Sequence, residues 1–315
     1  MAEWTANDIP NLRGRVVVVT GGNDGLGFES AKALARNEAE VILACRSTER
    51  GEVAKREIVA AVPHANVRVM KLDLQDLSSI ETFANEFNKD AGRLDVLLNN
   101  AGIMGAPYGV TRDGFEAQMG TNHLGHFALT GRLLGALKRT ARSRVVTVSS
   151  SAHRTGTMSF DNLLFRDGRG YTPLKAYGRS KLANLLFAYE LQRRFERHGI
   201  DCISVAAHPG ASQTNLGRHV EKTLVLRLLK PALRRVVQDP ARGALPQLRA
   251  AVDPQVRGGE YYGPGRLHGM SGAPVAVRSS RASRSLRDAK RLWRESEDLT
   301  GVRYEWAKPT EKRPS

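Results

Sequence analysis

The feature that most constrains the fold is a glycine-rich turn that follows a short apolar run near the start of the chain. Residues 15–20, Arg-Val-Val-Val-Val-Thr, are mostly β-branched, which predicts a strand buried on both faces of a parallel sheet. Gly21, Gly25 and Gly27 follow, and then a helical stretch runs through about residue 37. Such glycines let a pyrophosphate approach the N-terminus of the helix, where free N–H groups receive it. The alternative is an ordinary glycine-rich turn, because Gly-x-x-x-Gly-x-Gly differs from the commoner Gly-x-Gly-x-x-Gly spacing.

The alternation of strand and helix continues along the chain. Further strands are predicted at 41–45, 67–72, 94–98, 144–148, 200–207 and 259–262, the last of these being the final strand. Helices are predicted at 77–90, 112–138, from 177 onward, at 239–252 and at 285–299. This order predicts right-handed βαβ units and an α/β fold: a Rossmann-type doubly wound parallel sheet with helices on both faces, in a single domain.

Three polar or glycine positions stand at the predicted carboxyl ends of strands, where ligands of such sheets bind. Asp73 follows one strand, and Asn100 and Gly102 follow another. Asp73 has the chemistry to accept a hydrogen bond from the amino group of adenine. Asn100 either lines the nucleotide or simply ties two strands together.

The end of the second strand bears on the choice of nucleotide. An acidic residue there would bind the adenosine ribose hydroxyls and repel a 2′-phosphate. This strand instead ends Cys45-Arg46, and the guanidinium of Arg46 can pair with a phosphate. We therefore expect NADP(H) rather than NAD(H). The alternative is that Arg46 is only a surface charge, and Asp24 in the glycine loop argues mildly against a phosphate nearby.

A tyrosine and a lysine four residues apart, Tyr177 and Lys181, open a long apolar-periodic segment. Residues at this spacing share one face of a helix. A phenol ionises near pH ~10, and a neighbouring ammonium favours the phenolate and lowers the pKa. The pair could therefore exchange a proton with an alcohol or carbonyl oxygen near neutral pH.

Two other tyrosine–lysine pairs have the same spacing. Tyr171 and Lys175 flank Pro173, which suits the first turn of a helix, so Tyr171 is expected to precede that helix. Tyr304 and Lys308 lie in a charged C-terminal tail, a poor place for a preorganised site. We expect that tail to be frayed and a change of Tyr304 to Phe to be almost silent.

Three consecutive serines end the strand before the tyrosine–lysine pair. Residues 144–151 read Arg-Val-Val-Thr-Val-Ser-Ser-Ser, and a polar insert at 153–173 separates them from Tyr177. A serine at a strand end can stabilise charge on a substrate oxygen. The pattern alone does not choose among the three, and strand ends carry serine routinely.

Composition bounds the class of protein. The 315 residues are 41% hydrophobic, typical of a soluble globular protein, and no apolar run approaches the ~18 residues of a membrane span. The N-terminus has no basic stretch followed by an apolar core, so no secretory signal is expected. Cys45 and Cys202 fall in apolar runs and are expected to be free thiols in a reducing, cytoplasmic compartment, with no disulfide and no metal site.

The net charge of +16 is concentrated late in the chain. Basic residues punctuate residues 224–235 and recur from Arg278 onward. A solvated helix face is the simplest interpretation, and we expect no nucleic-acid partner, because no binding motif accompanies the charge and aromatic residues are only 6%. Residues 211–237 are expected to form a substrate lid, which either makes peripheral membrane contact or packs on the core.

Taken together, the motifs resemble the short-chain dehydrogenase/reductase family over residues 13–265. The motifs that carry this resemblance are Thr20-Gly21-Gly-Asn-Asp-Gly25-Leu-Gly27, Asn99-Asn100-Ala101-Gly102, Asn122, Ser150, Tyr177-x-x-x-Lys181 and Pro209-Gly210. The resemblance implies an oxidoreductase in which Tyr177 is the general acid/base and Lys181 lowers its pKa and holds the nicotinamide ribose. It also implies that Ser150 holds the substrate oxygen and that Asn122 anchors a water-linked proton relay. The full set predicted to bind the cofactor is Gly21, Asn23, Gly25, Leu26, Gly27, Arg46, Asp73, Leu74, Asn100, Ala101, Gly102, Tyr177, Lys181, Pro209 and Gly210.

Finer features are similar to retinol-dehydrogenase-like members of the family. They are Ala44-Cys45-Arg46, Asn122-His-Leu-Gly-His-Phe127, Ser150-Ser-Ala-His153, Ser180-Lys-Leu-Ala-Asn184, His208-Pro-Gly210 and the long insert. Such relatives prefer NADP(H) and act on lipophilic alcohols or carbonyl compounds, retinol-like or steroid-like. Light-dependent protochlorophyllide reductases are also relatives. The chain departs from many retinol dehydrogenases in showing no N-terminal membrane anchor.

The predicted organisation is an N-terminal extension at 1–12, the catalytic domain at 13–265 and a basic C-terminal extension at 266–315. The resemblance implies a homodimer that pairs through the helices holding Asn122 and Tyr177. The alternative function is a non-catalytic NADPH-binding sensor or interaction protein, which would not need Ser150, Tyr177 and Lys181.

Overall fold

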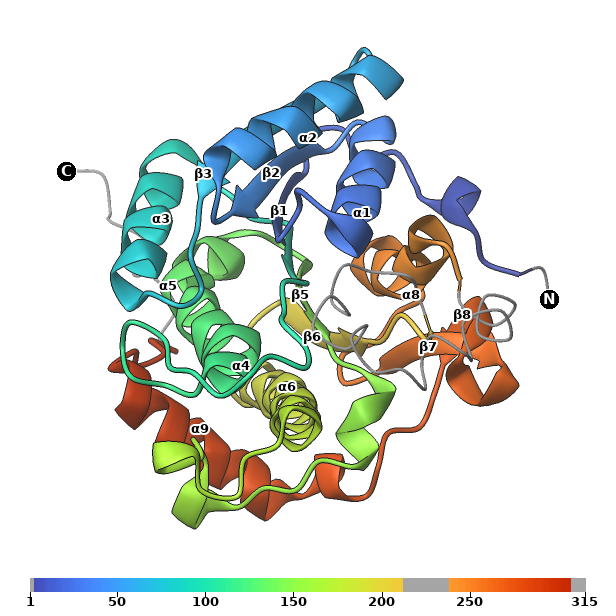
Figure 1. The fold of residues 1–315 in the computed structure, drawn as a ribbon. Coiled ribbons are helices and arrows are strands. Elements are labelled where there is room, and N and C mark those ends of the chain that lie inside the picture. The colour runs from blue at the N-terminus through green and yellow to red at the C-terminus, as the bar shows by residue number, and fades with distance from the viewer. Residues whose placement is uncertain (1–2, 212–237, 307–315) are drawn as a thin grey trace.

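The computed structural model describes residues 3–211 and 238–306, in which a twisted sheet lies between two layers of helices (Figure 1). Its strands are β1 (Val16–Thr20), β2 (Glu40–Cys45), β3 (Asn66–Lys71), β4 (Val96–Asn99), β5 (Ser143–Val148), β6 (Cys202–Ala207), β7 (Tyr261–Arg266) and β8 (Ser271–Ala276). The order across the sheet is β3-β2-β1-β4-β5-β6-β7-β8, and every neighbouring pair is parallel except β7 and β8. The predicted doubly wound parallel sheet is confirmed.

Helices cover both faces of this sheet. They are α1 (Gly25–Arg36), α2 (Thr48–Ala61), α3 (Leu77–Asp90), α4 (Ala117–Met119), α5 (Gly125–Arg139), α6 (Pro173–Arg197), α8 (Pro240–Val252) and α9 (Leu286–Thr300). Helices α3, α5 and α6 share one apolar core with Val16 and Val18, whereas α1, α2 and α8 share another with Val17 and Val19. The alternating side chains of β1 thus enter two cores, which is why its sequence is apolar at nearly every position.

Several element predictions are corrected by the structure. The helix predicted at 112–138 starts at Ala117 and contains a π-helical turn, η2 (Gly120–Leu124). The strand predicted as the last one is followed by the antiparallel β8, whose sequence Ser-Gly-Ala-Pro-Val-Ala lacks strand formers. Proline is tolerated in β8 because it is an edge strand. The predictions also missed α2.

The chain beyond residue 265 belongs to the same body as the rest. The predicted boundary falls inside β7, and β8 pairs with it. Helix α9 packs against α6 and buries Leu292 and Trp293, while its basic residues Arg287, Lys290 and Arg294 are exposed on the opposite side. The basic residues of α9 thus form a solvated face, but the segment that carries them is an integral part of the domain rather than an extension.

The expected fraying of the tail is wrong for residues up to 306. Tyr304 is 5% exposed and donates a hydrogen bond from its hydroxyl to Phe127 O at 2.8 Å. Its ring lies 4.6 Å from the ring of Trp293, and a side chain at Gly131 on α5 would meet Tyr304 and Val302 at 2.7 Å. The outer surfaces of α5 and α6, expected to pair two copies of the chain, are therefore covered at least in part by the chain itself.

Three further expectations concern compartment and surface. Cys45 and Cys202 are free and buried, and burial raises the pKa of the Cys45 thiol to about 11 and that of Cys202 to about 12. Within residues 3–211 and 238–306, none of the helices combines the length and the apolar character that a bilayer crossing requires. Apart from Ala211, the predicted lid lies outside the described residues.

The packing of Tyr304 predicts a stability effect. Tyr304→Phe removes the donor to Phe127 O and should lower the free energy of unfolding by about 1 kcal/mol. Urea unfolding followed by fluorescence would measure this loss. The control is Tyr108→Phe, because Tyr108 is 40% exposed. Equal unfolding midpoints for the two variants would contradict the packing role of Tyr304.

Candidate active site

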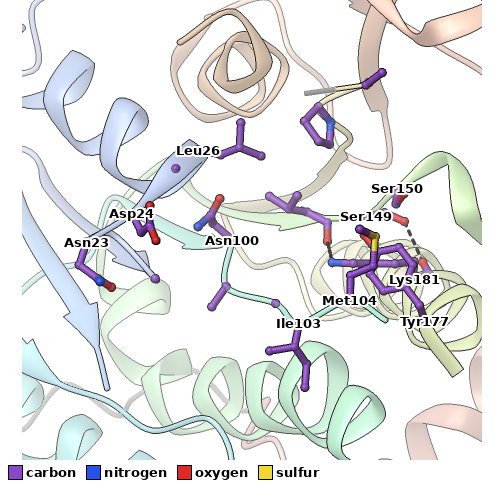
Figure 2. A pocket seen from close by; sticks show the side chains of 18 of the residues that line it. Asn23, Asp24, Leu26, Asn100, Ile103, Met104, Ser149, Ser150, Tyr177 and Lys181 are labelled. Carbon is purple, nitrogen blue, oxygen red and sulfur yellow. Dashed lines mark hydrogen bonds between the residues drawn. The ribbon is translucent and has the colours of Figure 1, made fainter. Parts of the chain in front are cut away.

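One cavity, of about 510 Å³, lies at the carboxyl ends of the central strands (Figure 2). The glycine loop after β1 closes one end, and Ser150, Tyr177 and Lys181 stand at the other. Twelve of the predicted site residues line it: Gly21, Asn23, Gly25, Leu26, Asn100, Ala101, Gly102, Ser150, Tyr177, Lys181, Pro209 and Gly210. The fold therefore brings most of the predicted nucleotide and catalytic residues to one place.

The glycine loop depends on backbone geometry that side chains would prevent. Gly21 and Gly25 have φ of +64° and +53°, a region that favours glycine. A Cβ atom on Gly27 would lie 2.2 Å from Gly21 O and 2.6 Å from Asn100 Nδ2. Gly27 does not line the cavity but lets α1 begin directly beneath the loop. The N-terminus of α1 then faces the cavity, as a pyrophosphate site requires.

Asn100 ties two strands together, which was one of its two predicted roles. Its side-chain amide donates to Thr20 O at 2.8 Å, and its Oδ1 accepts from Gln247 of α8 at 3.1 Å. The backbone N–H groups of Asn100 and Ala101 both donate to Thr20 Oγ1 at 2.9 Å. With its side chain committed to these bonds, Asn100 shapes the loop that lines the cavity. Buried Gln247 was missed because a single glutamine in a helix carries no sequence signal.

The tyrosine–lysine pair stands on the buried first turns of α6. Pro173 occupies the first helical turn, and the side chain of Thr172 accepts a hydrogen bond from Lys175 N, so Tyr171 precedes the helix as predicted. Tyr177 and Lys181 are 7% and 2% exposed, and Lys181 Nζ lies 5.7 Å from the centre of the Tyr177 ring. Lys181 Nζ donates to Val148 O at 3.1 Å.

The electrostatics of the pair differ from the expectation. Burial raises the pKa of Tyr177, and the hydrogen bond with Ser150 opposes this increase only in part. Burial lowers the pKa of Lys181 to about 8. The net shift of the tyrosine pKa is upward rather than downward as expected, because desolvation of the phenolate dominates. Tyr177 is therefore protonated at neutral pH.

The structure chooses among the three serines. Ser149 Oγ donates to Lys181 O at 2.8 Å, so this hydroxyl anchors the helix. Ser150 lines the cavity and hydrogen-bonds the side chain of Tyr177, whereas Ser151 is exposed and does not line it. Of the three serines, Ser150 is therefore the one placed to hold an oxygen together with Tyr177.

Asn122 lies in the π-helical turn behind the cavity. Its Oδ1 accepts from Ile103 N at 2.8 Å, and its Nδ2 donates to Ile103 O at 3.0 Å and to Ser180 Oγ at 2.9 Å. A Cβ atom on Gly102 would lie 3.1 Å from Asn122 Oδ1 and 3.4 Å from Lys181 Nζ. Asn122 thus fixes the loop after β4 against α6; its part in a proton relay stays a prediction.

The long insert between Ser150 and Tyr177 is held by Arg179, which sequence reasoning did not single out. Arg179 is 2% exposed and donates to the carbonyl oxygens of Thr157, Asn162 and Leu163 at 2.6–3.1 Å. Its guanidinium lies 3.9 Å from the centre of the Phe165 ring. The insert is therefore packed onto the helix that carries Tyr177.

Four predicted residues besides Gly27 lie outside the cavity lining. Arg46 is exposed beyond the end of β2, and Asn122 stands one layer behind. Asp73 Oδ1 accepts from Gln75 N at 3.0 Å, and Leu74 is buried, with its carbonyl packed against Gly125. The roles of Asp73 and Leu74 in binding a cofactor stay predictions.

Other lining residues were missed by the sequence. Arg50 of α2 lines the glycine-loop end and pairs with Asp24 at 3.2 Å, and Ile103, Met104 and Val148 supply apolar surface. An arginine in a helix and apolar residues in a loop are common, so no signal marked them. Within the described parts of the chain, no three His, Cys, Asp or Glu side chains are grouped to hold a metal ion.

Comparison with known proteins establishes the family. A family profile described as short chain dehydrogenase matches residues 15–163. Retinol dehydrogenase 11 of Homo sapiens is 43% identical over 293 residues, which span 92% of this chain and 87% of that protein. The chain belongs to the short-chain dehydrogenase/reductase family, and within it to a retinol-dehydrogenase-like group.

Solved structures agree with this assignment. A crystal structure of an uncharacterised protein from Mycobacterium paratuberculosis has a TM-score of 0.81 and 43% identity, and the match covers 96% of this chain and 100% of that one. The structure of Pseudomonas aeruginosa RhlG in an active-site complex with NADP has a TM-score of 0.64 and 24% identity, with 80% of this chain and 94% of that one covered. The latter likeness concerns the fold alone.

The glycine loop gives a prediction about cofactor binding. Gly27→Ala places a Cβ atom against Gly21 O, and overpacking of this kind costs about 1–3 kcal/mol. If the whole cost falls on cofactor binding, we expect the affinity for the nicotinamide cofactor to fall by about 5- to 150-fold, measured by fluorescence titration. Gly92→Ala is the control, because a Cβ atom there would meet nothing within 4 Å. Full affinity in the Gly27 variant would contradict the packing of the loop against α1.

Proposed function

We propose that this protein is an NADP(H)-dependent oxidoreductase that interconverts a lipophilic alcohol and the corresponding carbonyl compound, with Tyr177 as the general acid/base. The observation that carries the proposal is the convergence of Ser150, Tyr177 and Lys181 at one end of a cavity whose other end is the glycine loop. A nucleotide held at the loop would extend toward these three side chains. The protein supplies position and charge, whereas bound NADP(H) supplies or accepts the hydride.

The protein's part in carbonyl reduction is proton donation and stabilisation of the developing alkoxide. Tyr177 donates its phenolic proton to the substrate oxygen, and the hydroxyl of Ser150 donates a hydrogen bond to the same oxygen. The raised pKa of Tyr177 keeps the acid form available at neutral pH. The ammonium of Lys181, 5.7 Å from the ring centre, stabilises the phenolate that remains. In alcohol oxidation the same proton moves in the opposite direction.

The lining near Tyr177 supports a proposal for the substrate class. Ile103, Met104 and Val148 bring apolar side chains to this part of the cavity, and the side chain of methionine adapts to irregular ligands. An apolar surface favours a lipophilic substrate, and a relative that is 43% identical to this chain is retinol dehydrogenase 11 of Homo sapiens. We therefore propose that retinol-like aldehydes and alcohols belong to the substrate range.

Preference for NADP(H) is proposed from two arginines near the end of β2. Arg46 follows the strand directly, and Arg50 lines the cavity at the glycine-loop end. Both guanidinium groups are exposed at the protein surface. A 2′-phosphate that binds there would replace its hydrogen bonds to water by charge-assisted hydrogen bonds to the arginines. Arg50 already pairs with Asp24, so a phosphate would compete with that carboxylate for its guanidinium.

The central test is Tyr177→Phe. The variant keeps the ring but loses the transferable proton, so we expect NADPH affinity to be retained and turnover of lipophilic aldehydes to fall by at least about 1,000-fold. The assay is NADPH consumption across a panel of lipophilic aldehydes, ketones and quinones. Tyr304→Phe is the control and should keep its turnover, because Tyr304 is buried away from the cavity. Near-normal turnover in the Tyr177 variant would contradict the role of Tyr177 as the general acid/base. NADPH binding without turnover in the unaltered protein would favour the alternative function, a non-catalytic NADPH sensor.

The arginines give a separate prediction. Arg46→Ala and Arg50→Ala should each weaken NADPH binding by about tenfold or more, as the loss of a charge-assisted hydrogen bond implies, and leave NADH binding nearly unchanged. Isothermal titration with both nucleotides measures the difference. Arg56→Ala, at an exposed position on the helix that also holds Arg50, is the matched control. Equal losses of NADPH and NADH affinity would show that the arginines do not bind the 2′-phosphate of NADPH.

A further inference from the structure

A buried histidine bridges the loop of Ser150 and the C-terminal part of the chain. His153 is 1% exposed and lies three residues after Ser150. Its Nδ1 lies 2.6 Å from Ser150 O, and its Nε2 lies 3.1 Å from Ser280 N. The N–H of Ser280 can only donate, so Nε2 is the acceptor and the ring proton is on Nδ1. His153 therefore donates to the carbonyl oxygen of Ser150 and accepts from Ser280.

The surroundings keep this ring in its neutral form. Burial lowers the pKa of His153, and the positive charge of Arg154 lowers it further, although the Ser150 carbonyl opposes this. The ring also meets the ring of Tyr261 edge-on, with their centres 5.7 Å apart. Both hydrogen bonds consequently persist at neutral pH, with one defined tautomer.

Residues 278–280, which bond to His153 through Ser280, are held by two further hydrogen bonds. Arg154 donates to Arg278 O at 2.9 Å, and the hydroxyl of Tyr189 on α6 donates to Ser279 Oγ at 2.9 Å. His153 and Arg154 thus connect the loop after Ser150 to residues 278–280. Tyr189 connects the same residues to α6, the helix that carries Tyr177. Neither His153 nor residues 278–280 line the cavity, and the hydrogen bond from His153 to Ser150 O links them to a residue that does.

We propose that His153 is a positioning residue that sets the orientation of Ser150 toward Tyr177, and that residues 278–280 act as its anchor. The inference rests on the proposed function, since it assigns a task within that reaction. Because Ser150 O lies 2.6 Å from His153 Nδ1, the hydrogen bond between them fixes the peptide plane between Ser150 and the next residue. Small errors in the placement of a hydrogen-bond donor lower the rate of catalysis, so a residue that fixes the Ser150 hydroxyl affects turnover.

Two substitutions separate the two hydrogen bonds of the ring. In His153→Asn the amide nitrogen replaces Nδ1, which keeps the bond to Ser150 O and loses the acceptor for Ser280. In His153→Gln the amide oxygen replaces Nε2, which keeps the bond from Ser280 and loses the donor to Ser150. Both variants remove the ring from its contact with Tyr261, so their stabilities form a matched comparison.

The experiment measures NADPH-dependent turnover, NADPH affinity and melting temperature for both variants. We expect His153→Gln to lower kcat by at least about tenfold and His153→Asn by no more than about threefold, with similar melting temperatures and NADPH affinities. In a Ser150→Ala background, His153→Gln should cause no further loss, because it acts through Ser150. His64→Gln, an exposed histidine after α2, is the control for the assay.

Three kinetic results would overturn the proposal. They are equal loss of kcat in the Asn and Gln variants, full activity in the Gln variant, and additive losses with Ser150→Ala. Nitrogen-15 NMR of the His153 ring tests the same bridge without turnover: protonated Nδ1 and unprotonated Nε2 are expected, and the reverse tautomer would refute it. If the unaltered protein lacks turnover, the proposed function fails, and the NMR result still decides whether the ring donates to Ser150.

Discussion

One carbonyl oxygen at the end of β5 holds the part of α6 that carries Tyr177 and Lys181. Val148 O accepts hydrogen bonds from Lys181 Nζ at 3.1 Å and Asn184 Nδ2 at 3.0 Å, and the next residue, Ser149, donates from its Oγ to Lys181 O at 2.8 Å. A buried ammonium is costly unless it is hydrogen-bonded, and here the strand end supplies the acceptor. The position of Tyr177, one turn earlier on α6, follows from this junction rather than from local helix preference.

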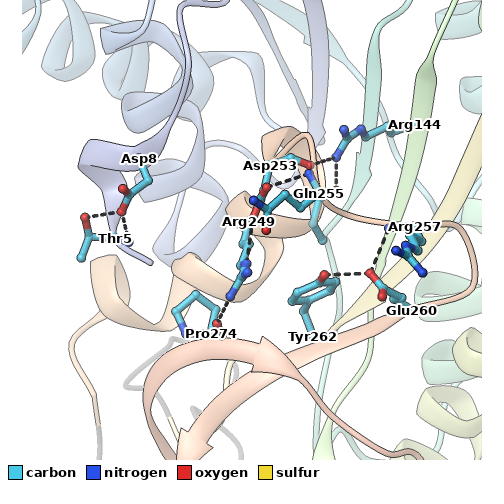
Figure 3. A network of polar contacts seen from close by, with 11 residues as sticks. Thr5, Asp8, Arg144, Arg249, Asp253, Gln255, Arg257, Glu260, Tyr262 and Pro274 are labelled. Carbon is cyan, nitrogen blue, oxygen red and sulfur yellow. Dashed lines mark hydrogen bonds and ion pairs between the residues drawn. The ribbon is translucent and has the colours of Figure 1, made fainter. Parts of the chain in front are cut away.

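A second polar network fixes the opposite end of β5 to the last elements of the sheet (Figure 3). Arg144 donates to Ala250 O at 3.1 Å and to Asp253 O at 2.9 Å, so a cation stands at the C-terminus of α8, where the helix dipole favours it. Arg249 pairs with Asp253 at 2.9 Å and donates to Pro274 O at 2.6 Å. Because β8 is held by the side chain of Arg249 as well as by strand pairing, it forms despite its weak sequence.

The parts that could be predicted from the sequence are those whose signal is local. Buried parallel strands need apolar side chains on both faces, and the glycine loop needs particular backbone angles. Each requirement produces a recognisable pattern within a few residues of sequence. Tyr177 was identified by its helical context, but Ser150 could be separated from its neighbours only by the resemblance. Arg50, Met104 and the burial of Tyr304 depend on contacts between distant segments. A charged or aromatic residue in a tail looks the same whether it is solvated or packed, and only the fold distinguishes the two.

The end of β1 and the start of α6, on opposite sides of the cavity, are joined by a buried chain of hydrogen bonds. His126 contacts Thr20 Oγ1 through Nε2 at 2.9 Å and Asn122 O through Nδ1 at 3.0 Å. Asn122 Nδ2 donates to Ser180 Oγ, which donates to Tyr177 O at 2.8 Å. Burial lowers the pKa of His126 to about 4, so its neutral ring donates from Nδ1 and accepts the Thr20 proton at Nε2. Because His126 contacts Thr20 and Asn122 donates to Ser180, the π-helical turn is held against the end of β1 and the start of α6 at the same time.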